Sequence, residues 1–303
     1  MRGHRPGHGA SVTRGVYVRR RLTAVAVIAV VLAALVVMIG GHGTVRRARP
    51  GVLAAGASGP VALIPARSHA GRGGSLSELR VIRHVLAYTS YIAVGRPRRR
   101  ELALSFDDGP GPFTPQILAV LRRQHVKATF FETGRQVSLY PRYTAQLARA
   151  GMVIGDHTET HPPMAELSTT AQASQLDQAS RAIHAAGAPR PLLFRPPYGS
   201  FDPTTLALLR ARDMLMALWT VDTSDYARPG VPRITYVALS GAKPGAIILF
   251  HDGGGDRSQT VAALPRIIKK LKTRGYRLVT IPQLLKDDPP APGQPPPHNL
   301  SGF

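Results

Sequence analysis

Between residues 76 and 286, short apolar runs alternate with longer segments of helical periodicity, and this alternation restricts the folds open to the chain. The apolar runs predict seven strands, at residues 102–106, 128–131, 152–154, 192–194, 215–221, 246–250 and 277–281. Helix-start and helix-stop residues predict helices at 114–125, 138–150, 168–186, 202–212 and 259–273. Strands separated by helices usually pair in parallel, so we predict an α/β fold. Seven strands favour a distorted, partly open barrel over an open sheet.

Titratable or chelating side chains follow five of these predicted strands. In chain order they are Asp107 and Asp108, then Asp156, His157 and His161, then Arg195 and Tyr198, then Asp222 and Asp225, then His251 and Asp252. The carboxyl ends of parallel strands lie at one end of a barrel, and catalytic groups are built there. We therefore expect a single site that draws on all five segments.

The adjacent carboxylates Asp107 and Asp108 end the first predicted strand and precede Gly109-Pro110. Neighbouring residues on a strand point to opposite faces, so both can face one cavity only if the strand ends between them. Paired carboxylates repel each other unless a cation offsets one of them. The pair therefore predicts a metal ligand beside a general base, and the alternative is a turn with two solvated acids.

His157 and His161 are four residues apart, which on a helical turn places both rings on one face. With Asp108 they make an Asp-His-His set that suits Zn²⁺ with open positions for water and substrate. Thr158 stands where zinc peptidases of the His-Glu-x-x-His type carry glutamate, which counts against that class. Two surface histidines are the alternative interpretation.

Five motifs in this order resemble those of the polysaccharide deacetylases, the NodB-homology domain of carbohydrate esterase family 4. The resemblance covers about residues 89–285 and implies a barrel of the NodB type. The motifs are Ser105-Phe-Asp-Asp-Gly-Pro110, His157-Thr-Glu-Thr-His-Pro162, Arg195-Pro-Pro-Tyr-Gly199, Asp222-Thr-Ser-Asp-Tyr226 and Leu249-Phe-His251. A single motif of this kind is weak, whereas five in the same order are specific.

The resemblance also implies a role for each matched residue. Asp107 would be the general base, and Arg195 would hold it ionised and oriented. Asp108, His157 and His161 would bind the metal. His251 would be the general acid, oriented by Asp225, and the Tyr198 backbone N–H would stabilise the oxyanion. Pro197, Tyr198 and Tyr226 would contact the substrate.

The implied function is a metal-dependent hydrolase that removes acetyl groups from N-acetylated cell-wall glycan, with peptidoglycan expected. The reaction would use water activated by Zn²⁺, with Co²⁺ or another divalent metal as alternatives. The alternative functions are deacetylation of chitooligosaccharides or O-acetyl-xylan, and a non-catalytic protein that binds wall glycan.

Three residues depart from the family pattern or need a separate interpretation. Tyr226 stands where the family has Trp, which changes the expected pocket wall. Asp156 replaces the usual Asn, and we predict that it bonds to backbone. Trp219, the only Trp, is predicted to lie in the core.

The ends of the chain differ in composition from its middle. Residues 1–21 are basic, and residues 22–40 are an apolar run long enough to cross a bilayer. The arginines before this run predict a cytoplasmic N-terminus and an extracellular catalytic domain on a single-pass anchor, with secretion after signal cleavage as the alternative. We predict a flexible linker at 41–88, the catalytic domain at 89–286 and a Pro-rich disordered tail at 287–303.

The net charge of +22 and the absence of cysteine further restrict function. Without cysteine there are no disulfides, thiolate metal sites or Cys nucleophiles. The charge predicts contact with an anionic cell wall and membrane. No nucleic-acid-binding motif is present, so we expect no nucleic-acid partner. We expect a monomer.

Overall fold

The computed structural model describes residues 72–293, and their strands form one nine-stranded sheet. The order is β1-β6-β5-β4-β3-β2-β8-β7, with β9 also paired to β2, and all of these pairings are parallel. The strands are β1 (Tyr91–Ile92), β2 (Glu101–Gly109), β3 (Thr129–Glu132), β4 (Val153–Asp156), β5 (Leu193–Phe194), β6 (Leu215–Ala217), β7 (Val221–Asp222), β8 (Ile247–His251) and β9 (Arg277–Val279). The predicted parallel α/β fold is confirmed.

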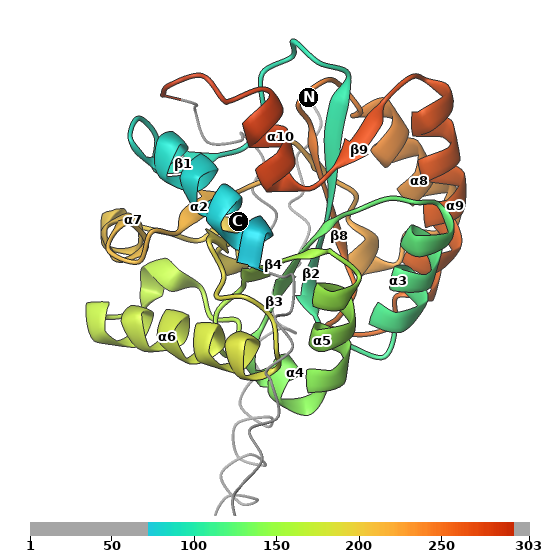
Figure 1. Ribbon diagram of the computed structural model, residues 1–303. Helices are drawn as coiled ribbons and strands as arrows, with labels where there is room; N and C mark the ends of the chain where they lie inside the picture. Colours follow the sequence, from blue (N-terminus) through green and yellow to red (C-terminus); the bar gives the residue numbers. More distant parts are fainter. Residues whose placement is uncertain (1–71, 294–303) are drawn as a thin grey trace, which may run out of the picture. The chain divides into compact units, whose positions relative to one another are not determined.

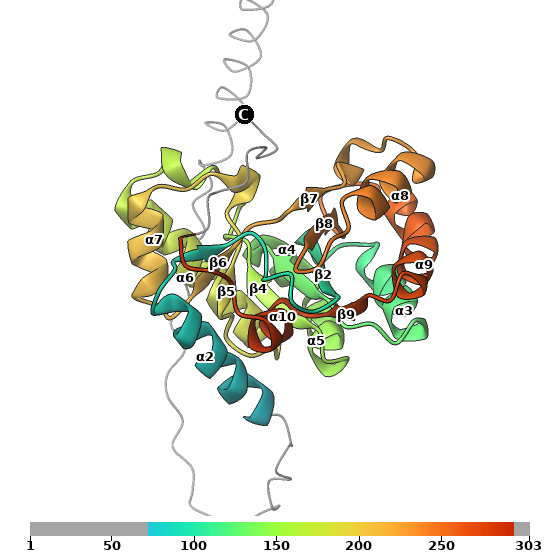
Figure 2. The same ribbon diagram turned by 90° about the horizontal axis from the view of Figure 1, so that it is seen from above.

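Helices surround the curled sheet, with α3, α8 and α9 on one side and α6 and α7 on the other (Figures 1 and 2). They are α2 (Arg72–Leu86), α3 (Thr114–Arg123), α4 (Gly134–Leu139), α5 (Pro141–Arg149), α6 (Thr169–Ala185), α7 (Pro203–Arg210), α8 (Val231–Ser240), α9 (Ser258–Thr273) and α10 (Ile281–Asp287), with 3₁₀ turns η1 (Met164–Glu166), η2 (Pro197–Gly199) and η3 (Asp225–Ala227). The predicted helix starts at Ser168 and Asp202 are confirmed, because each side chain caps its helix.

The predicted strand at 215–221 is two strands, and this division curls the sheet into a distorted barrel. β6 pairs with β5 and β1, whereas β7 pairs with β8 at the other end of the strand order. Between them, Leu218 N–H donates to Ile92 O at 2.7 Å and Thr220 N–H donates to Ile247 O at 2.9 Å. The chain therefore crosses from one end of the sheet to the other within three residues.

The long strand β2 has two different faces. Leu102, Leu104 and Phe106 pack in the cluster that joins the sheet to the surrounding helices α3, α8 and α9. The alternate residues Ser105 and Asp107 face the barrel interior, where both meet the same buried arginine. The apolar face holds the strand in place, and its polar face supplies the site.

The prediction of a flexible linker at 41–88 is wrong from residue 72 onward, because α2 occupies residues 72–86. Ile82, Val85 and Leu86 lie three and four residues apart and are buried in the cluster that includes α10. That apolar stripe, short and interrupted by Arg83 and His84, gave only a weak sequence signal. The predicted anchor at 22–40 and the rest of the linker lie outside the described residues.

The predicted disordered tail is also corrected at its start. Asp287 ends α10, and Asp288 is buried and accepts the backbone N–H of Arg98 at 2.8 Å. This bond fixes the chain just after the helix, while residues 294–303 lie outside the described part. Within residues 72–293, no helix combines the length and apolarity needed to cross a bilayer.

Candidate metal and catalytic site

The two carboxylates after β2 face one cavity because the strand becomes irregular between them. The pairing with β3 shifts register between Asp107 and Gly109, and Asp108 has a positive φ of 69°. Gly109 is required beside them, since a Cβ there would lie 2.3 Å from Asp252 Oδ2. The prediction that the strand ends between the two carboxylates is wrong, because β2 continues to Gly109 and an irregularity within the strand brings both side chains to the cavity.

Asp108, His157 and His161 bring three ligand atoms within 4.8 Å of one another. Asp108 Oδ1 lies 3.5 Å from His157 Nε2 and 3.1 Å from His161 Nε2. His157 Nδ1 lies 2.6 Å from Arg195 O, so Nδ1–H donates to that carbonyl and the Nε2 lone pair faces Asp108. Asp108 Oδ1 is buried and has no hydrogen-bond donor. Electron-pair donors that converge in this way fit a divalent cation.

Opposing effects set the charge of these ligands. Burial alone would raise the pKa of Asp108, but its interactions with the nearby His157 and His161 rings hold that pKa well below its usual range. Burial would lower the pKa of His157, and the charges of Asp107 and Asp108 raise it instead. The negative field at this point favours a cation, whether a proton or a metal ion.

Arg195 crosses the barrel interior, is fully buried and supports both the base and a metal ligand. Its Nη1 donates to Asp107 Oδ1 at 2.7 Å and to Ser105 Oγ at 2.9 Å. The remaining nitrogens donate to Ala217 O and Leu218 O, in and after β6. Burial lowers the pKa of Arg195, and Asp107 opposes that effect. The predicted pairing of Arg195 with Asp107 is present.

His251 ends β8 and is adjacent to Asp107 in the sheet register. Its Nδ1 lies 2.7 Å from Asp225 Oδ1, and its backbone N–H donates to Asp225 Oδ2 at 3.0 Å. Burial would lower the pKa of His251, but Asp225 raises it to about 9. The geometry thus provides an imidazole held by a buried carboxylate, and the predicted pairing of His251 with Asp225 is present.

These groups line one cavity of about 590 Å³. It is lined by Asp107, Asp108, Thr133, Gln136, His157, His161, Pro196, Tyr198, Trp219, Tyr226, Leu249, His251, Gly254 and Arg257. Tyr226 packs edge-on against His251 with ring centroids 5.2 Å apart, and Tyr198 likewise against His161 at 4.7 Å. Both tyrosines are exposed at the rim, where a substrate can meet them.

Two side chains near the cavity are placed differently from the predictions. Pro197 is buried and does not line the cavity, whereas its neighbour Pro196 does. Trp219 is buried as predicted, yet it also forms part of the cavity wall. Asp156 bonds to the backbone N–H of Thr158 at 2.8 Å and to Ser180 Oγ at 2.7 Å, which agrees with a role in shaping the loop.

Sequence reasoning missed several groups around the site. Arg257 lines the cavity, and its guanidinium donates to the carbonyls of Gly253, Gly254 and Tyr226. Glu132 is fully buried at the end of β3, and burial raises its pKa to about 8. Asp252 was among the groups predicted after the strands, and burial likewise raises its pKa to about 7. The Gly-rich run before Arg257 was the available signal for a close backbone approach.

Comparison with known proteins places these residues in a family. The family model described as polysaccharide deacetylase matches residues 95–217. A peptidoglycan-N-acetylglucosamine deacetylase of Bacillus cereus is 37% identical over 210 residues, covering 68% of this chain and 98% of that protein. A chitooligosaccharide deacetylase of Bradyrhizobium is 39% identical over 199 residues, covering 61% of this chain and 90% of that protein.

A solved structure adds a useful contrast. The crystal structure of a pseudoenzyme of carbohydrate esterase family 4 from Bacillus anthracis is 35% identical, with a TM-score of 0.61, and covers 64% of this chain and 70% of that one. Membership alone therefore does not decide activity, and the side chains at the site must. The likeness in sequence, fold and motif order shows that this chain belongs to the polysaccharide deacetylases of carbohydrate esterase family 4.

Proposed function

We propose that the protein is a divalent-metal-dependent deacetylase that hydrolyses the acetamido groups of N-acetylated cell-wall glycan, with peptidoglycan as substrate. One observation carries the proposal. A three-residue metal site, Asp108, His157 and His161, lies in the same cavity as a carboxylate supported by Arg195 and an imidazole supported by Asp225. Amide hydrolysis needs these three functions together.

The base and its support act on the attacking water. A divalent metal held by Asp108, His157 and His161 supplies, when bound, polarisation of the acetyl carbonyl and acidification of water. Asp107 is placed to accept the proton, since its Oδ2 lies 3.8 Å from His157 Nε2 at the ligand cluster. Arg195 occupies Oδ1 and leaves Oδ2 free toward the cavity.

The acid completes the reaction on the other side of the cavity. Water oxygen bonds to the acetyl carbon, and the C–N bond then breaks. The leaving amine needs a proton, which His251 donates and Asp225 stabilises in the imidazolium form. Acetate and the free amine are the products. The backbone N–H of Tyr198, in a turn with φ of 59°, is proposed as an oxyanion donor.

Acetate release from purified peptidoglycan tests the proposal. His157→Ala and chelation should each abolish release, and Asp107→Asn should reduce it by about 10²–10⁴-fold, the share of a general base. Glu166→Gln, at an exposed position on η1, is the matched control and should retain activity. Activity that survives both His157→Ala and chelation would refute the proposal.

Chitooligosaccharide is the second candidate substrate, favoured by the identity to the Bradyrhizobium enzyme. Side-by-side assays on peptidoglycan and N-acetylated chitooligosaccharides should show a higher kcat/KM on peptidoglycan. A higher kcat/KM on chitooligosaccharides would make the oligosaccharide the proposed substrate instead. A protein that binds sacculi, retains no metal and releases no acetate would belong with the pseudoenzymes instead.

We propose Zn²⁺ as the metal, because two imidazoles and one carboxylate form a ligand set that it favours. Reconstitution of the chelated protein with Zn²⁺ or Co²⁺ should restore acetate release, whereas Mg²⁺ should not.

We also propose that residues 22–40 anchor the protein in the cytoplasmic membrane with the catalytic domain outside. Protease accessibility in intact protoplasts tests this, since an anchored outer domain is cleaved while the N-terminus is protected.

A further inference from the structure

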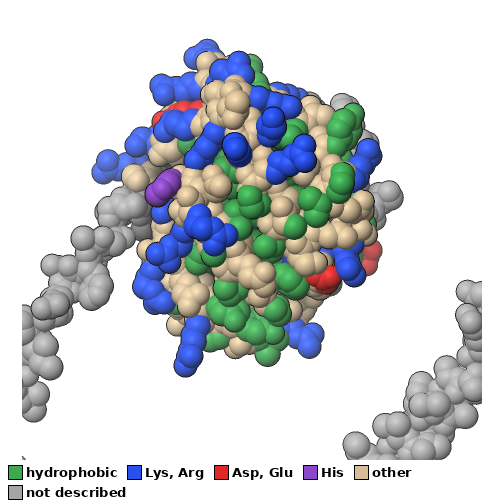
Figure 3. All heavy atoms as spheres, turned by 90° about the vertical axis from the view of Figure 1, so that its right-hand side faces the viewer, with side chains coloured by type: hydrophobic (Ala, Val, Ile, Leu, Met, Phe, Trp, Pro, Cys, Tyr) green, Lys and Arg blue, Asp and Glu red, His purple; other side chains and the backbone are tan. Residues whose placement is uncertain are grey.

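One side of the barrel carries basic side chains on helices that contain no acidic ones. Residues 109–131, 133–155, 226–251 and 257–286 include no Asp or Glu, and they supply α3, α5, α8 and α9. Figure 3 views this side, where Lys and Arg are spread over the surface and acidic side chains are few. Many partly exposed acidic residues lie in other segments, among them Glu78, Glu159, Glu166, Asp177 and Asp213, whereas Asp256 shortly precedes α9 and pairs with Arg228.

Seven exposed cations form what we call the α3–α9 basic face. They are Arg122, Arg123, Lys127, Arg149, Lys269, Lys270 and Lys272. The face holds four of the six lysines in a chain with 39 basic residues. Among residues 72–293, the ion pairs closer than 4 Å involve other residues and none of these seven. Their charge is therefore available to a partner.

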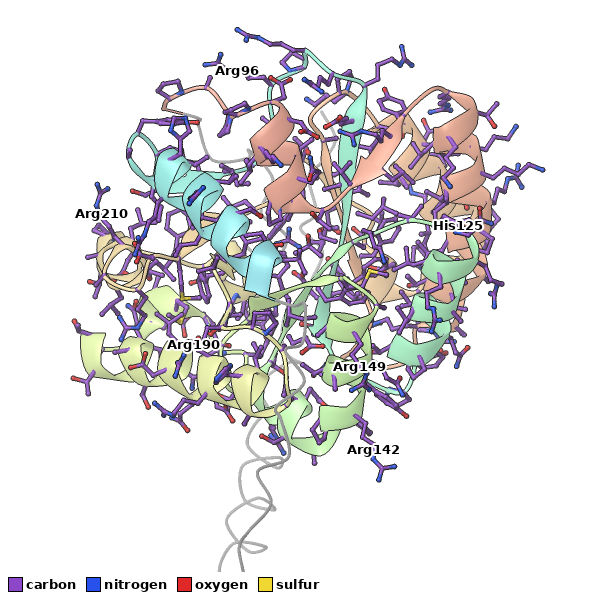
Figure 4. All side chains as sticks on the ribbon, viewed as in Figure 1. Arg96, His125, Arg142, Arg149, Arg190 and Arg210 are labelled. Carbon is purple, nitrogen blue, oxygen red and sulfur yellow. The ribbon has the colours of Figure 1, made fainter. Side chains whose placement is uncertain are left out.

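The face is continuous across three helices. Lys272 Nζ donates to Gln124 O, which joins the ends of α9 and α3, and Lys127 Nζ donates to Ala150 O after α5. Two hollows follow this line. One of about 630 Å³ is lined by Arg122, Lys127 and Arg149 among others, and one of about 440 Å³ by His125 and Lys272 among others. In Figure 4, His125 and Arg149 lie on this side, whereas Arg190 and Arg210 lie on the other.

Helix stability does not account for the missing acids. Basic residues near helix ends are favourable, but an acidic residue in a first turn adds about 0.3–1 kcal/mol, and α3, α5, α8 and α9 have none there. Soluble surfaces also usually mix both signs of charge. The other α-helices also lack an acidic first turn, so the inference of an anionic partner rests on the absence of acidic side chains from the whole of α3, α5, α8 and α9.

We propose that the α3–α9 basic face binds a linear polymer of phosphodiester-linked units. A phosphodiester backbone carries a fixed negative charge on every unit, and phosphate binds both lysine, as a point charge, and arginine, through its fork. The exposed large apolar side chains of the described part are Leu139, Tyr198, Tyr226 and Tyr236, and none belongs to α3, α5 or α9. Helices α3, α5 and α9 thus present no exposed large apolar side chain to insert into lipid or to stack on bases, whereas Tyr236 is exposed on the neighbouring α8.

This binding would leave the catalytic cavity open. Lys127 and Arg149 precede β3 and β4 and so lie at the amino ends of the strands, while the site lies at their carboxyl ends. The inference goes beyond glycan deacetylation and does not depend on it. A bound polymer would hold the domain beside its substrate without competing for the site.

The test compares two full-length variants with equal changes in charge. One replaces Lys269, Lys270 and Lys272 with Glu, and the control replaces Arg80, Arg190 and Arg210, all exposed outside the face, with Glu. Affinity for poly(glycerol phosphate) should fall about a hundredfold or more in the face variant, since each cation near an anionic surface contributes roughly fivefold. The control should lose no more than about threefold, through long-range attraction that salt screens.

Salt dependence gives a second measure. The slope of log affinity against log salt should be shallower by about 2 in the face variant, the share of three phosphate contacts on a single chain. Arg122→Gln combined with Lys127→Gln is a milder variant on α3 and should also weaken binding. Acetate release from a small soluble substrate should be unchanged in both variants, which separates this proposal from the catalytic one.

Several results would overturn the proposal. Equal losses of affinity in the face and control variants would show that binding depends on net charge alone and not on the α3–α9 basic face. Unchanged affinity in the Arg122→Gln, Lys127→Gln variant would show that the α3–α9 basic face is not the binding site. This result holds even if the Glu variant fails to fold. Tighter face-dependent binding to single-stranded DNA, phosphatidylglycerol vesicles or polygalacturonate would assign the face to nucleic acid, lipid or a carboxylate polymer instead.

Discussion

At the scale of single residues, the site works through pairs in which one partner holds the other. Asp225 holds His251 and Arg195 holds Asp107, and each supporting group is buried. The supports are as necessary as the groups they hold, because a buried charge without its partner is strongly destabilised. Two predictions follow from these pairs.

The first concerns the pH dependence of kcat/KM. Asp225 raises the pKa of His251 to about 9, so the acid stays protonated below that pH and is lost as pH rises through it. Asp225→Asn removes the raising charge while burial remains, so the alkaline limb of acetate release should move about 1–3 units toward acid. Asp256→Asn, at an exposed ion pair with Arg228, is the control. An alkaline limb that stays in place would show that His251 is not the acid.

The second concerns the buried arginine. Arg195→Lys keeps the charge but cannot reach Asp107, Ala217 O and Leu218 O together. We expect the unfolding free energy to fall by about 3–5 kcal/mol, which is typical of a broken buried ion pair. We also expect the rate of acetate release to fall below about one-hundredth of the wild-type rate. Urea unfolding and single-substrate kinetics measure these effects. Near-normal activity would show that Asp107 does not need this support.

The sequence alone predicted most of these residues because each follows a strand. Asp107, His157, Arg195 and His251 all stand directly after an apolar run or within a few residues of one. Arg257 and Glu132 were missed, since their importance comes from burial against segments far away in the chain. Pro197 was chosen over Pro196 because a motif does not tell which of two neighbouring rings faces the cavity.

At the scale of elements, the errors share one cause, which is tertiary contact overriding a weak local pattern. The single apolar run at 215–221 became β6 and β7 because each half pairs with a different strand. Helix α8 was not predicted, since its ten residues follow Gly230 and include Pro232. Helix α2 was assigned to a linker although three of its apolar residues are buried.

The position of α2 in the fold gives a prediction on stability. Ile82 is fully buried in the cluster around α10, so Ile82→Ala should lower the unfolding free energy by about 2–5 kcal/mol. Arg80→Ala, two residues away and exposed, should change it by less than about 0.5 kcal/mol. Urea unfolding of both variants decides the matter. Equal changes in unfolding free energy in the two variants would show that residues 72–86 do not pack on the domain and belong to the linker.

At the scale of the whole molecule, charge is unevenly distributed inside as well as outside. Glu132, Asp156 and Asp252 are fully buried near the carboxyl ends of the strands, and burial raises the pKa of each to about 7 or 8. Each of these three carboxyls therefore keeps its proton to a higher pH in the folded chain than in the unfolded chain. Their contribution to the unfolding free energy should fall as pH rises from about 4 to 7 or 8.

Glu132→Gln tests this dependence. The pKa of Glu132 lies at about 8 in the fold against an ordinary 4.5, so this group alone lowers stability by roughly 1 kcal/mol per pH unit between those values. Urea unfolding at several pH values should show a shallower decline in Glu132→Gln. Glu166→Gln, exposed on η1, should keep the original slope. An unchanged slope in Glu132→Gln would mean that this carboxyl is ionised in the fold.

One arginine, Arg195, connects two parts of the site through its hydrogen bonds. The carbonyl of Arg195 accepts from the ring of His157 while its guanidinium donates to Asp107, so any movement of β5 would carry both side chains together. His251 stands apart, on β8, and is held by Asp225 of η3. Natural variation that adapts the enzyme to new sugars should therefore accumulate among residues 227–230, which follow Asp225 and can vary while its bond to His251 and the bond between Arg195 and Asp107 stay in place.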